Sequence, residues 1–178
     1  MQDFRLLFRD TLKVSHQRKW CITAAFVIVH TTSRNDVAQL RERMMQDTES
    51  ALMRGQQYLM AIEQTEQPSI NEALKDIAPD LARMAISFAY GEIYSRPALN
   101  LRQRQLVTVA ALAAIGGAEP QLRFHIAGAL NVGCSPREVA ELMIHLVVYA
   151  GFPAALNGMS AARTVFSEKG VNFVPVLT

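Results

Sequence analysis

From Asp36 onwards, apolar residues recur at helical spacing, and no stretch shows the apolar–polar alternation of a half-buried strand. Start and stop signals divide this part of the chain. Asn100 precedes an apolar run that ends at Gly116-Gly117, and Ser135-Pro-Arg-Glu138 is a capping box with proline at the first helical position. The pattern predicts an all-α fold.

Further helix starts are expected at two places. Ser69-Ile-Asn-Glu72 has the form of a capping box, and Asp80 is expected to cap the next helix. That next helix has one apolar face, made by Leu81, Met84, Ala85 and Phe88. The predicted helices cover, in order, about residues 36–63, 69–78, 80–94, 101–115, 120–132, 136–150 and 154–169.

Two of the predicted helices carry more apolar surface than one small bundle needs to bury. The segment from Val107 to Ile115 is apolar on all sides, which predicts a central buried helix. Residues 106–115 and 142–150 are therefore candidates for packing between subunits, and we expect a homo-oligomer.

The chain has 178 residues, half of them apolar, which is enough for one sizeable core and predicts a single domain. Its net charge is only +2, from 18 basic and 16 acidic residues, and it lacks a dense basic stripe, so nucleic acid is not an expected partner. Cys21 and Cys134 are far apart and match no metal or redox spacing. We expect both to be buried apolar side chains in a protein of the reducing cytoplasm.

The first thirty-five residues differ from the rest of the chain. They contain a basic patch, Trp20, His16, His30 and the apolar stretch 21–29. That stretch is too short to span a bilayer as a helix, and no small-residue cleavage site follows it cleanly, so we expect neither a membrane protein nor a secreted one. Residues 1–50 are expected to form an N-terminal extension.

Two histidines lie on predicted helices in the apolar region, and histidine suits proton transfer near neutral pH. Gln121 lies one turn before His125 and shares its face. On the next helix, Glu141, His145 and Tyr149 form one stripe. The stripe can hold an imidazole and a phenol for catalysis, or it can be an ordinary hydrogen-bond network between helices.

Two arginines have alternative interpretations. Arg96, which precedes Pro97, can clamp a carboxylate or can pair with Glu92 across the end of a helix, and the pairing is favoured. Arg123 lies on a different face from His125 and is expected to be a solvated surface charge. Phosphate-loop, dinucleotide-binding, serine-hydrolase, zinc-protease and Cys-x-x-Cys motifs are absent from the sequence, which excludes many common enzyme classes.

Four segments give the chain a resemblance to a known family. They are Gly91-Glu-Ile-Tyr-Ser-Arg-Pro97, Arg104-Gln-Leu-Val-Thr-Val-Ala-Ala-Leu-Ala-Ala114, His125-Ile-Ala-Gly-Ala-Leu-Asn-Val-Gly133 and Val148-Tyr-Ala-Gly-Phe-Pro-Ala-Ala-Leu-Asn157. Together they resemble the carboxymuconolactone decarboxylase family over about Arg54 to Glu168. The resemblance implies an all-α family domain, expected over residues 54–170, that assembles into trimers or hexamers.

The family has two activities, and the residues at a few motif positions distinguish the two branches. One branch, the alkyl hydroperoxidase D-like proteins, reduces peroxides with a Cys-x-x-Cys-x-x-x-His motif. His125 occupies the position of the motif histidine, but Ala118 and Gln121 occupy the positions of the cysteines, and Gln105 lies where the family has a relay glutamate. Since that chemistry needs a thiolate and a resolving thiol, we do not expect thiol peroxidase activity.

The resemblance implies the second activity, decarboxylation of 4-carboxymuconolactone or a similar small cyclic acid. The conjugated lactone carbonyl is itself the electron sink, so no metal or organic cofactor is expected. We expect His125 to be the general acid/base, with His145 and Tyr149 as oxyanion donors. The expected substrate contacts are Arg96, Gln121 and Gln105. Two alternatives stay open: a peroxidase homologue without redox cysteines, and a non-catalytic oligomeric binding protein.

Overall fold

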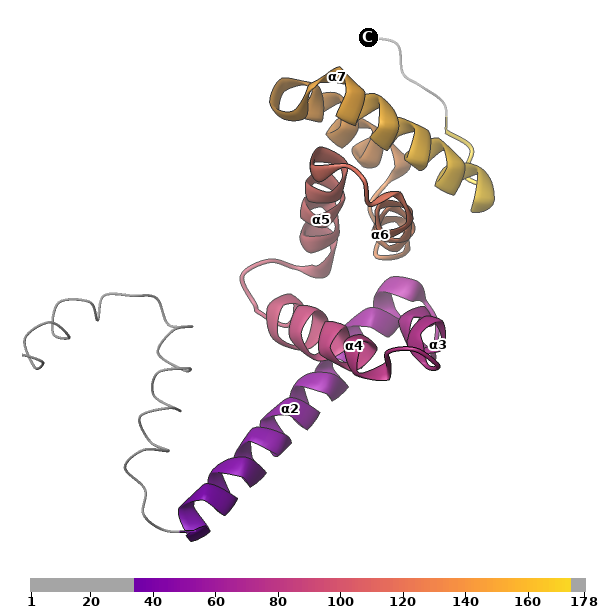
Figure 1. Ribbon diagram of the computed structural model, residues 1–178. Helices are drawn as coiled ribbons and strands as arrows, with labels where there is room; N and C mark the ends of the chain where they lie inside the picture. Colours follow the sequence, from indigo (N-terminus) through magenta and orange to yellow (C-terminus); the bar gives the residue numbers. More distant parts are fainter. Residues whose placement is uncertain (1–33, 174–178) are drawn as a thin grey trace, which may run out of the picture. The chain divides into compact units, whose positions relative to one another are not determined.

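The computed structural model describes residues 34–173 and contains only helices in that range (Figure 1). The all-α prediction is therefore confirmed for the described part of the chain. Predictions for Cys21, His16, His30 and the apolar stretch 21–29 fall outside the described residues. The helices are α2 (Arg34–Glu63), α3 (Ser69–Leu74), α4 (Pro79–Met84), the π-helix η1 (Ala85–Tyr94), α5 (Leu101–Ile115), α6 (Glu119–Asn131) and α7 (Pro136–Glu168).

The chain divides into two compact units, residues 1–47 and 48–178. Helix α2 runs through the boundary, so the first unit shares this helix with the second. The expected extension, residues 1–50, and the expected family domain, residues 54–170, also meet within α2. All contacts discussed below lie within the second unit.

Local capping signals place the starts of α5 and α7 where the sequence predicts them. The Asn100 side chain accepts a hydrogen bond from Gln103 N at 2.9 Å, and the Gln103 side chain accepts one from Asn100 N at 2.9 Å. Ser135 and Glu138 form the same reciprocal pair at α7. Hydrogen bonds from the Ser135 backbone, from Arg102 and from the Ser135 hydroxyl lower the pKa of Glu138 to about 2.

Two predicted caps are wrong because neighbouring residues take the capping positions. Pro68, not Ser69, precedes the first turn of α3, and the Ser69 N–H donates to the Glu63 carboxylate at 2.9 Å. Ala78, not Asp80, precedes α4, because Pro79 has the fixed φ that suits a first helical residue.

The predicted helix 80–94 exists, and its second half is a π-helix. Ala82, Ile86 and Tyr90 are buried. Three of the four residues predicted to share the apolar face are more than half exposed: Leu81, Met84 and Phe88. The predicted face is wrong because the side that carries Ile86 and Tyr90 packs against Leu59 and Ile62 of α2.

Close packing of α2 against η1 depends on two glycines. A Cβ atom on Gly91 would collide with the carbonyl oxygen of Ala51, and one on Gly55 would collide with the carbonyl oxygen of Ile86. Gly55 therefore lets two backbones approach without interrupting helix α2.

Two apolar clusters form the core of the second unit. The smaller one joins α2 to η1 through Leu59, Ile62, Ile86 and Tyr90. The larger one joins α5, α6 and α7, and Val132 packs against both. Its members are Val109, Ala113, Leu122, Ile126, Ala129, Cys134, Val139, Met143, Leu146, Ala155, Ala161, Ala162, Val165 and Phe166.

The prediction that residues 107–115 form a helix buried on all sides is wrong for the single chain. Val109 and Ala113 are buried, whereas Val107 is 60% exposed and Ile115 is 78% exposed. The reason is that α6 and α7 pack against the same side of α5. An apolar side of α5 is left uncovered.

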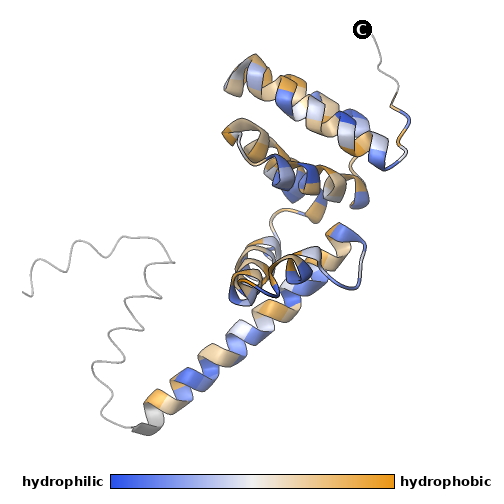
Figure 2. Ribbon diagram, turned by 45° about the vertical axis from the view of Figure 1, so that its right-hand side comes forward, coloured by the Kyte–Doolittle hydropathy of each residue, from blue (hydrophilic) through white to orange (hydrophobic). Residues whose placement is uncertain are grey.

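Helix α7 contains the two helices predicted over 136–150 and 154–169. They are separated by Gly151, whose φ of 80° and ψ of 168° are not helical, and Pro153 follows. Among the described residues, α7 is the one helix long and apolar enough to cross a membrane, a test that core helices also pass. Figure 2 shows its many apolar residues.

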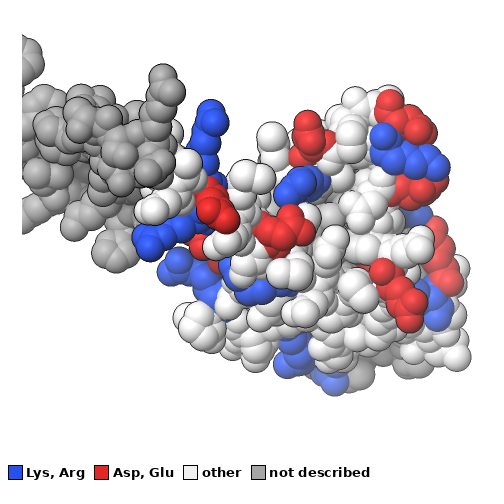
Figure 3. Space-filling view, turned by 90° about the horizontal axis from the view of Figure 1, so that it is seen from below, with Lys and Arg blue, Asp and Glu red and all other residues white. Residues whose placement is uncertain are grey.

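Charged side chains of both signs are interspersed on the face shown in Figure 3. The ion pairs in the structure include Arg102 with Glu138 and Arg123 with Glu168. Arg123 is at the surface, as expected, and pairs from α6 with Glu168 at the end of α7. Because both partners are partly exposed, each pair contributes little to stability.

Candidate functional site

The second unit brings His125 on α6 against Gln105 on α5. The His125 Nδ1 atom lies 2.9 Å from the Gln105 Oε1 atom, and Gln105 is fully buried. With this amide orientation the oxygen can only accept, so Nδ1 carries the proton and Nε2 keeps its lone pair. The two residues form a dyad that fixes the tautomer and the direction of the imidazole ring.

The dyad lies where α2, α5 and α6 pack closely together. A Cβ atom on Gly128 would lie 2.5 Å from Ile62 Cγ2 and 3.4 Å from Gln105 Oε1. The absence of a side chain at Gly128 therefore lets the end of α2 and the Gln105 amide pack against α6.

Hydrogen bonds of Asn131 link the junction of α2, α5 and α6 to neighbouring parts of the chain. Its side-chain Nδ2 donates to the Ile62 carbonyl at 2.8 Å, and its Oδ1 accepts from Lys169 at 2.8 Å. Gln64 donates to the Asn131 carbonyl at 3.0 Å. Asn131 thus has a positioning role, linking α2, α6 and the end of α7.

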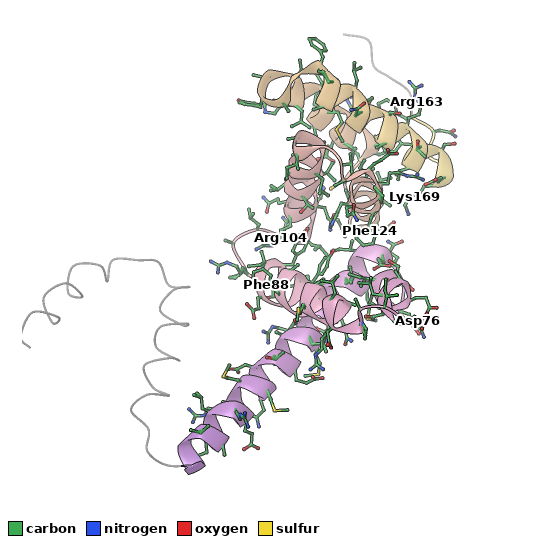
Figure 4. The ribbon with its side chains drawn as sticks, viewed as in Figure 1. Asp76, Phe88, Arg104, Phe124, Arg163 and Lys169 are labelled. Atoms are coloured by element: carbon green, nitrogen blue, oxygen red, sulfur yellow. The ribbon has the colours of Figure 1, made fainter. Side chains whose placement is uncertain are left out.

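The surroundings of His125 favour its neutral form. Burial lowers the pKa of His125 to about 4. The Phe124 ring meets the imidazole edge-on, with ring centroids 5.0 Å apart. Figure 4 labels Phe124 on α6 and Arg104 on α5, the two helices that carry the dyad. At neutral pH the ring is therefore a neutral base rather than a cation.

Two buried polar atoms near this junction lack a hydrogen-bond partner: Gln105 Nε2 and Glu63 Oε1. Leaving such a group unpaired costs about 1–3 kcal/mol. Gln105 Nε2 is therefore a donor available to a water molecule or to an oxygen of a ligand.

A second polar contact lies on the same helix as Gln105. The Tyr94 hydroxyl and the Thr108 Oγ1 atom are 2.6 Å apart, and Thr108 is three residues after Gln105. The Arg104 guanidinium lies 5.8 Å from the Tyr94 ring centroid and donates to the Arg96 and Leu99 carbonyls. The sequence analysis gave Thr108 no role; its spacing from Gln105 was the available signal.

The structure does not bring the other predicted site residues to the dyad. His145 and Tyr149 are exposed on α7, with ring centroids 5.2 Å apart and planes at 50°. Within the described range, no hydrogen bond or ring contact joins either of them to His125. Glu141, which completes the predicted stripe, is also exposed.

Arg96 and Gln121 are both exposed, and so is Glu92. The favoured pairing of Arg96 with Glu92 is wrong, because no ion pair joins them among the described residues. The helix ends at Tyr94, and the Arg96 carbonyl accepts a hydrogen bond from Arg104 at 2.6 Å. A cleft of about 640 Å³ also borders α6, but its lining includes Arg123 and Phe124 and not His125.

Cys134 is buried, as predicted, and its sulfur lies 3.7 Å from the Arg102 carbonyl oxygen. Burial raises the pKa of its thiol, which makes the nucleophilic thiolate scarce. The positions where the peroxidase motif has cysteines hold Ala118 and Gln121. The described part of the site therefore contains an imidazole and no cysteine at the motif positions.

The fold and the dyad define a helical protein with a partly buried, hydrogen-bonded histidine between packed helices. A profile of the carboxymuconolactone decarboxylase family matches residues 79–164. The chain is 40% identical over 100 residues to the 4-carboxymuconolactone decarboxylase of Acinetobacter baylyi, which covers 56% of this chain and 74% of that protein. The chain belongs to the carboxymuconolactone decarboxylase family, as the sequence analysis predicted.

Two further relatives match over a similar length. An uncharacterised 15.0 kDa protein of Paracoccus denitrificans is 30% identical over 98 residues, which is 54% of this chain and 73% of that protein. The nitrosuccinic acid decarboxylase of Metarhizium robertsii is 29% identical over 103 residues, which is 56% of this chain and 71% of that protein. Two of these three relatives are named as decarboxylases, which supports a carboxy-lyase.

Proposed function

We propose that this protein is a carboxy-lyase that decarboxylates a small cyclic carboxylic acid or lactone, with His125 as its acid/base residue. The observation that carries the proposal is the His125–Gln105 hydrogen bond of 2.9 Å, which orients the ring and leaves Nε2 free. The decarboxylase names of two relatives support the reaction class.

The proposed reaction needs one proton at one carbon atom. The bond between the ring carbon and the carboxylate breaks, CO2 leaves, and the electron pair passes into the conjugated carbonyl to give a dienolate. A proton from Nε2 of His125 then goes to carbon, and the solvent returns a proton to the imidazole. No metal or organic cofactor takes part in this sequence.

The low pKa of His125 fits this role when the substrate is an anion. The free imidazole, with a pKa of about 4, is almost entirely neutral at pH 7. A carboxylate bound beside the ring favours the charged form and raises its pKa by about 1–3 units. Substrate binding therefore increases the fraction of imidazolium that can give its proton to the dienolate.

Gln105 is proposed as a positioning residue, since it is fully buried and bonded to His125. Arg96 and Gln121 remain proposed substrate contacts, both at the protein surface. We also propose a soluble cytoplasmic protein that binds no nucleic acid.

The test is direct incubation with 4-carboxymuconolactone and a panel of related cyclic acids, followed by CO2 release. The wild-type protein should consume at least one of them, and His125→Ala should lose at least 100-fold in rate, the lower range for acid/base catalysis. Lys75→Ala, an exposed change in α3–α4, is the matched control and should keep full activity. A wild-type protein that releases CO2 from none of the panel contradicts the proposal.

The alternative of a thiol peroxidase is less well supported. The described cysteine, Cys134, is buried and its thiol pKa is raised. Protein-dependent turnover of peroxide with a dithiol reductant would favour that alternative.

A further inference from the structure

The amide of Gln105 has a hydrogen-bond donor that the described part of the chain does not use. Its oxygen accepts from the His125 Nδ1–H at 2.9 Å, whereas its Nε2 is buried without a partner. Glu63 Oε1 is the other unpaired buried atom, but its carboxylate accepts from Ser69 N and makes no bond to the amide. The Gln105 N–H groups are therefore left for an acceptor that the chain does not supply.

Thr108, one turn after Gln105 on α5, supplies a second donor. The hydroxyls of Ser95 and Thr164 donate to the backbone carbonyl four residues earlier, as is common in helices. Thr108 instead meets the Tyr94 hydroxyl, with 2.6 Å between the two oxygens. Since a phenol is a stronger acid than an aliphatic hydroxyl, Tyr94 donates and Thr108 accepts. The Thr108 proton is then left for another acceptor.

A positive charge lies next to these donors. The Arg104 guanidinium is 5.8 Å from the Tyr94 ring centroid, and it donates to the Arg96 and Leu99 carbonyls rather than to a carboxylate. Helix α5 itself carries no Asp or Glu. Arg104 therefore stabilises a negative charge that develops at the donors, and more strongly at a part-buried site than in water.

The burial of the surrounding residues sets the side from which a ligand reaches the donors. Gln105, Ile62 and Gly128 are buried, whereas His125 and Thr108 are half-buried. A ligand therefore approaches past the two half-buried side chains, which must move aside because Gln105 Nε2 is shielded in the free protein. The same shielding means that a ligand oxygen bonds to Nε2 without competition from bulk water.

We propose that Gln105 Nε2 and the Thr108 hydroxyl are the oxyanion donors of the decarboxylation, an inference that rests on the proposed function. When the bond to the carboxylate breaks and CO2 leaves, the electron pair moves onto the conjugated carbonyl oxygen, and the two donors hold that oxygen. The His125 imidazolium then gives its proton to carbon, which restores the carbonyl. This assigns to α5 the role that the sequence analysis expected of His145 and Tyr149.

Neutral donors suit this step and define the substrate class. An amide N–H and an aliphatic hydroxyl bind an oxyanion but are too weakly acidic to give it a proton, so protonation occurs at carbon and not at oxygen. The substrate is an acid whose carboxylate leaves a ring carbon conjugated with a carbonyl group. A saturated cyclic acid of the same size develops no charge at the donors and should not react.

Binding of two small lactones tests the donors without reference to activity. Tetronic acid is a five-membered lactone whose enol is ionised at neutral pH, so it carries the charge of the dienolate, and butenolide is its neutral counterpart. In NMR titrations the wild type should bind tetronate at least about 10-fold more tightly, and Thr108→Val should lose this preference. Thr164→Val, at a hydroxyl bonded within α7, is the matched control and should keep it. A wild type without the preference, or a folded Thr108→Val that retains it, overturns the inference.

Kinetics on a reactive acid of the panel separate a donor from a structural residue. Thr108→Val should lower kcat about 100-fold with little change in KM, as the loss of one oxyanion donor does, and Thr108→Ser should keep most of the rate. Tyr94→Phe leaves the Thr108 hydroxyl in place and should lose less than Thr108→Val. Equal losses in Thr108→Val and Thr108→Ser, or a change confined to KM, contradict the donor role.

Gln105→Glu distinguishes a donor from a residue that only positions His125. The carboxylate still accepts from the His125 Nδ1–H and increases the fraction of imidazolium, so a purely positioning role predicts an unchanged or higher kcat. A carboxylate has no N–H and repels the dienolate, so the donor role predicts a loss of at least about 100-fold in kcat. Wild-type kcat in Gln105→Glu overturns the inference.

The two sets of measurements separate the failure of the inference from the failure of the proposed function. A tetronate preference that needs Thr108, in a protein that releases CO2 from no acid of the panel, removes the proposed function and leaves the donor site. Decarboxylation that depends on His125 but survives both Thr108→Val and Gln105→Glu removes this inference alone.

Discussion

The Gln105 side chain holds His125 through a neutral amide, with 2.9 Å between Oε1 and Nδ1, where a carboxylate would make an ion pair. An amide fixes the tautomer without adding a charge. Burial is therefore free to dominate the pKa of the imidazole, which it lowers to about 4.

Replacing this amide by a carboxylate should raise the pKa of His125. In Gln105→Glu, an opposite charge about 3 Å from the ring stabilises the imidazolium and should raise that pKa by about 1–3 units. Titration of the imidazole by NMR measures the change. Gln103→Glu, an exposed change two residues earlier, is the matched control and should leave the pKa near its wild-type value. An unchanged pKa in Gln105→Glu would mean that the dyad does not form in solution.

Protonation of His125 should make stability depend on pH in a defined window. The ring has a pKa of about 4 in the folded protein and about 6.5 in the unfolded chain, so between these values the unfolded chain binds more protons. The free energy of unfolding should therefore fall as the pH drops from about 6.5 to 4, by on the order of 2–3 kcal/mol from this group. Urea unfolding of wild type and His125→Leu across this range isolates the contribution; parallel profiles for the two proteins would contradict it.

Gly128→Ala should destabilise the junction of α2, α5 and α6. The added Cβ would lie 2.5 Å from Ile62 Cγ2, so neighbouring groups must shift, at a cost of about 1–3 kcal/mol. Chemical denaturation measures the loss. In the double variant Gly128→Ala/Ile62→Ala the opposing methyl group is absent. The double variant should therefore lose less free energy of unfolding than the sum of the two single losses. Simple additivity would show that the two side chains do not meet.

The contact between Tyr94 and Thr108 should be worth about 0.5–1.5 kcal/mol, as an ordinary hydrogen bond between partly buried hydroxyls. A double-mutant cycle with Tyr94→Phe and Thr108→Val measures it in urea. Tyr90→Phe, in the same π-helix, is the control and should show no coupling to Thr108→Val, because Thr108 bonds to Tyr94. Zero coupling for Tyr94 as well would remove the contact.

Local signals were read correctly where the contacts that decide them are local. Asn100 and Ser135 cap their helices with residues three positions away, so the sequence contains both partners of each bond. Ser69 failed as a cap because Glu63, six residues earlier on another helix, takes the Ser69 N–H. Leu81 and Phe88 were assigned to a buried face, but Ile86 and Tyr90 make the contact with α2, and periodicity alone does not show which side of a helix meets another helix.

The exposure of residues 107–115 shows a different limit. An apolar run indicates that a segment is buried somewhere, but it does not say whether its own chain or another one covers it. In the single chain, Val109 is covered and Val107 is not. Val148 on α7 is likewise left uncovered by its own chain.

The order of residues is enough to locate the helices and to single out His125 as a candidate, because periodicity, caps and motif spacing are properties of neighbouring residues. It did not determine which polar group meets that histidine. Gln105 is twenty residues away, and its contact exists because α5 and α6 pack closely over Gly128. It also placed Tyr149 near the chemistry by pattern, whereas packing turned that side chain outward. Only tertiary structure sets such distances, since they depend on how helices cross and on which faces the core has already taken.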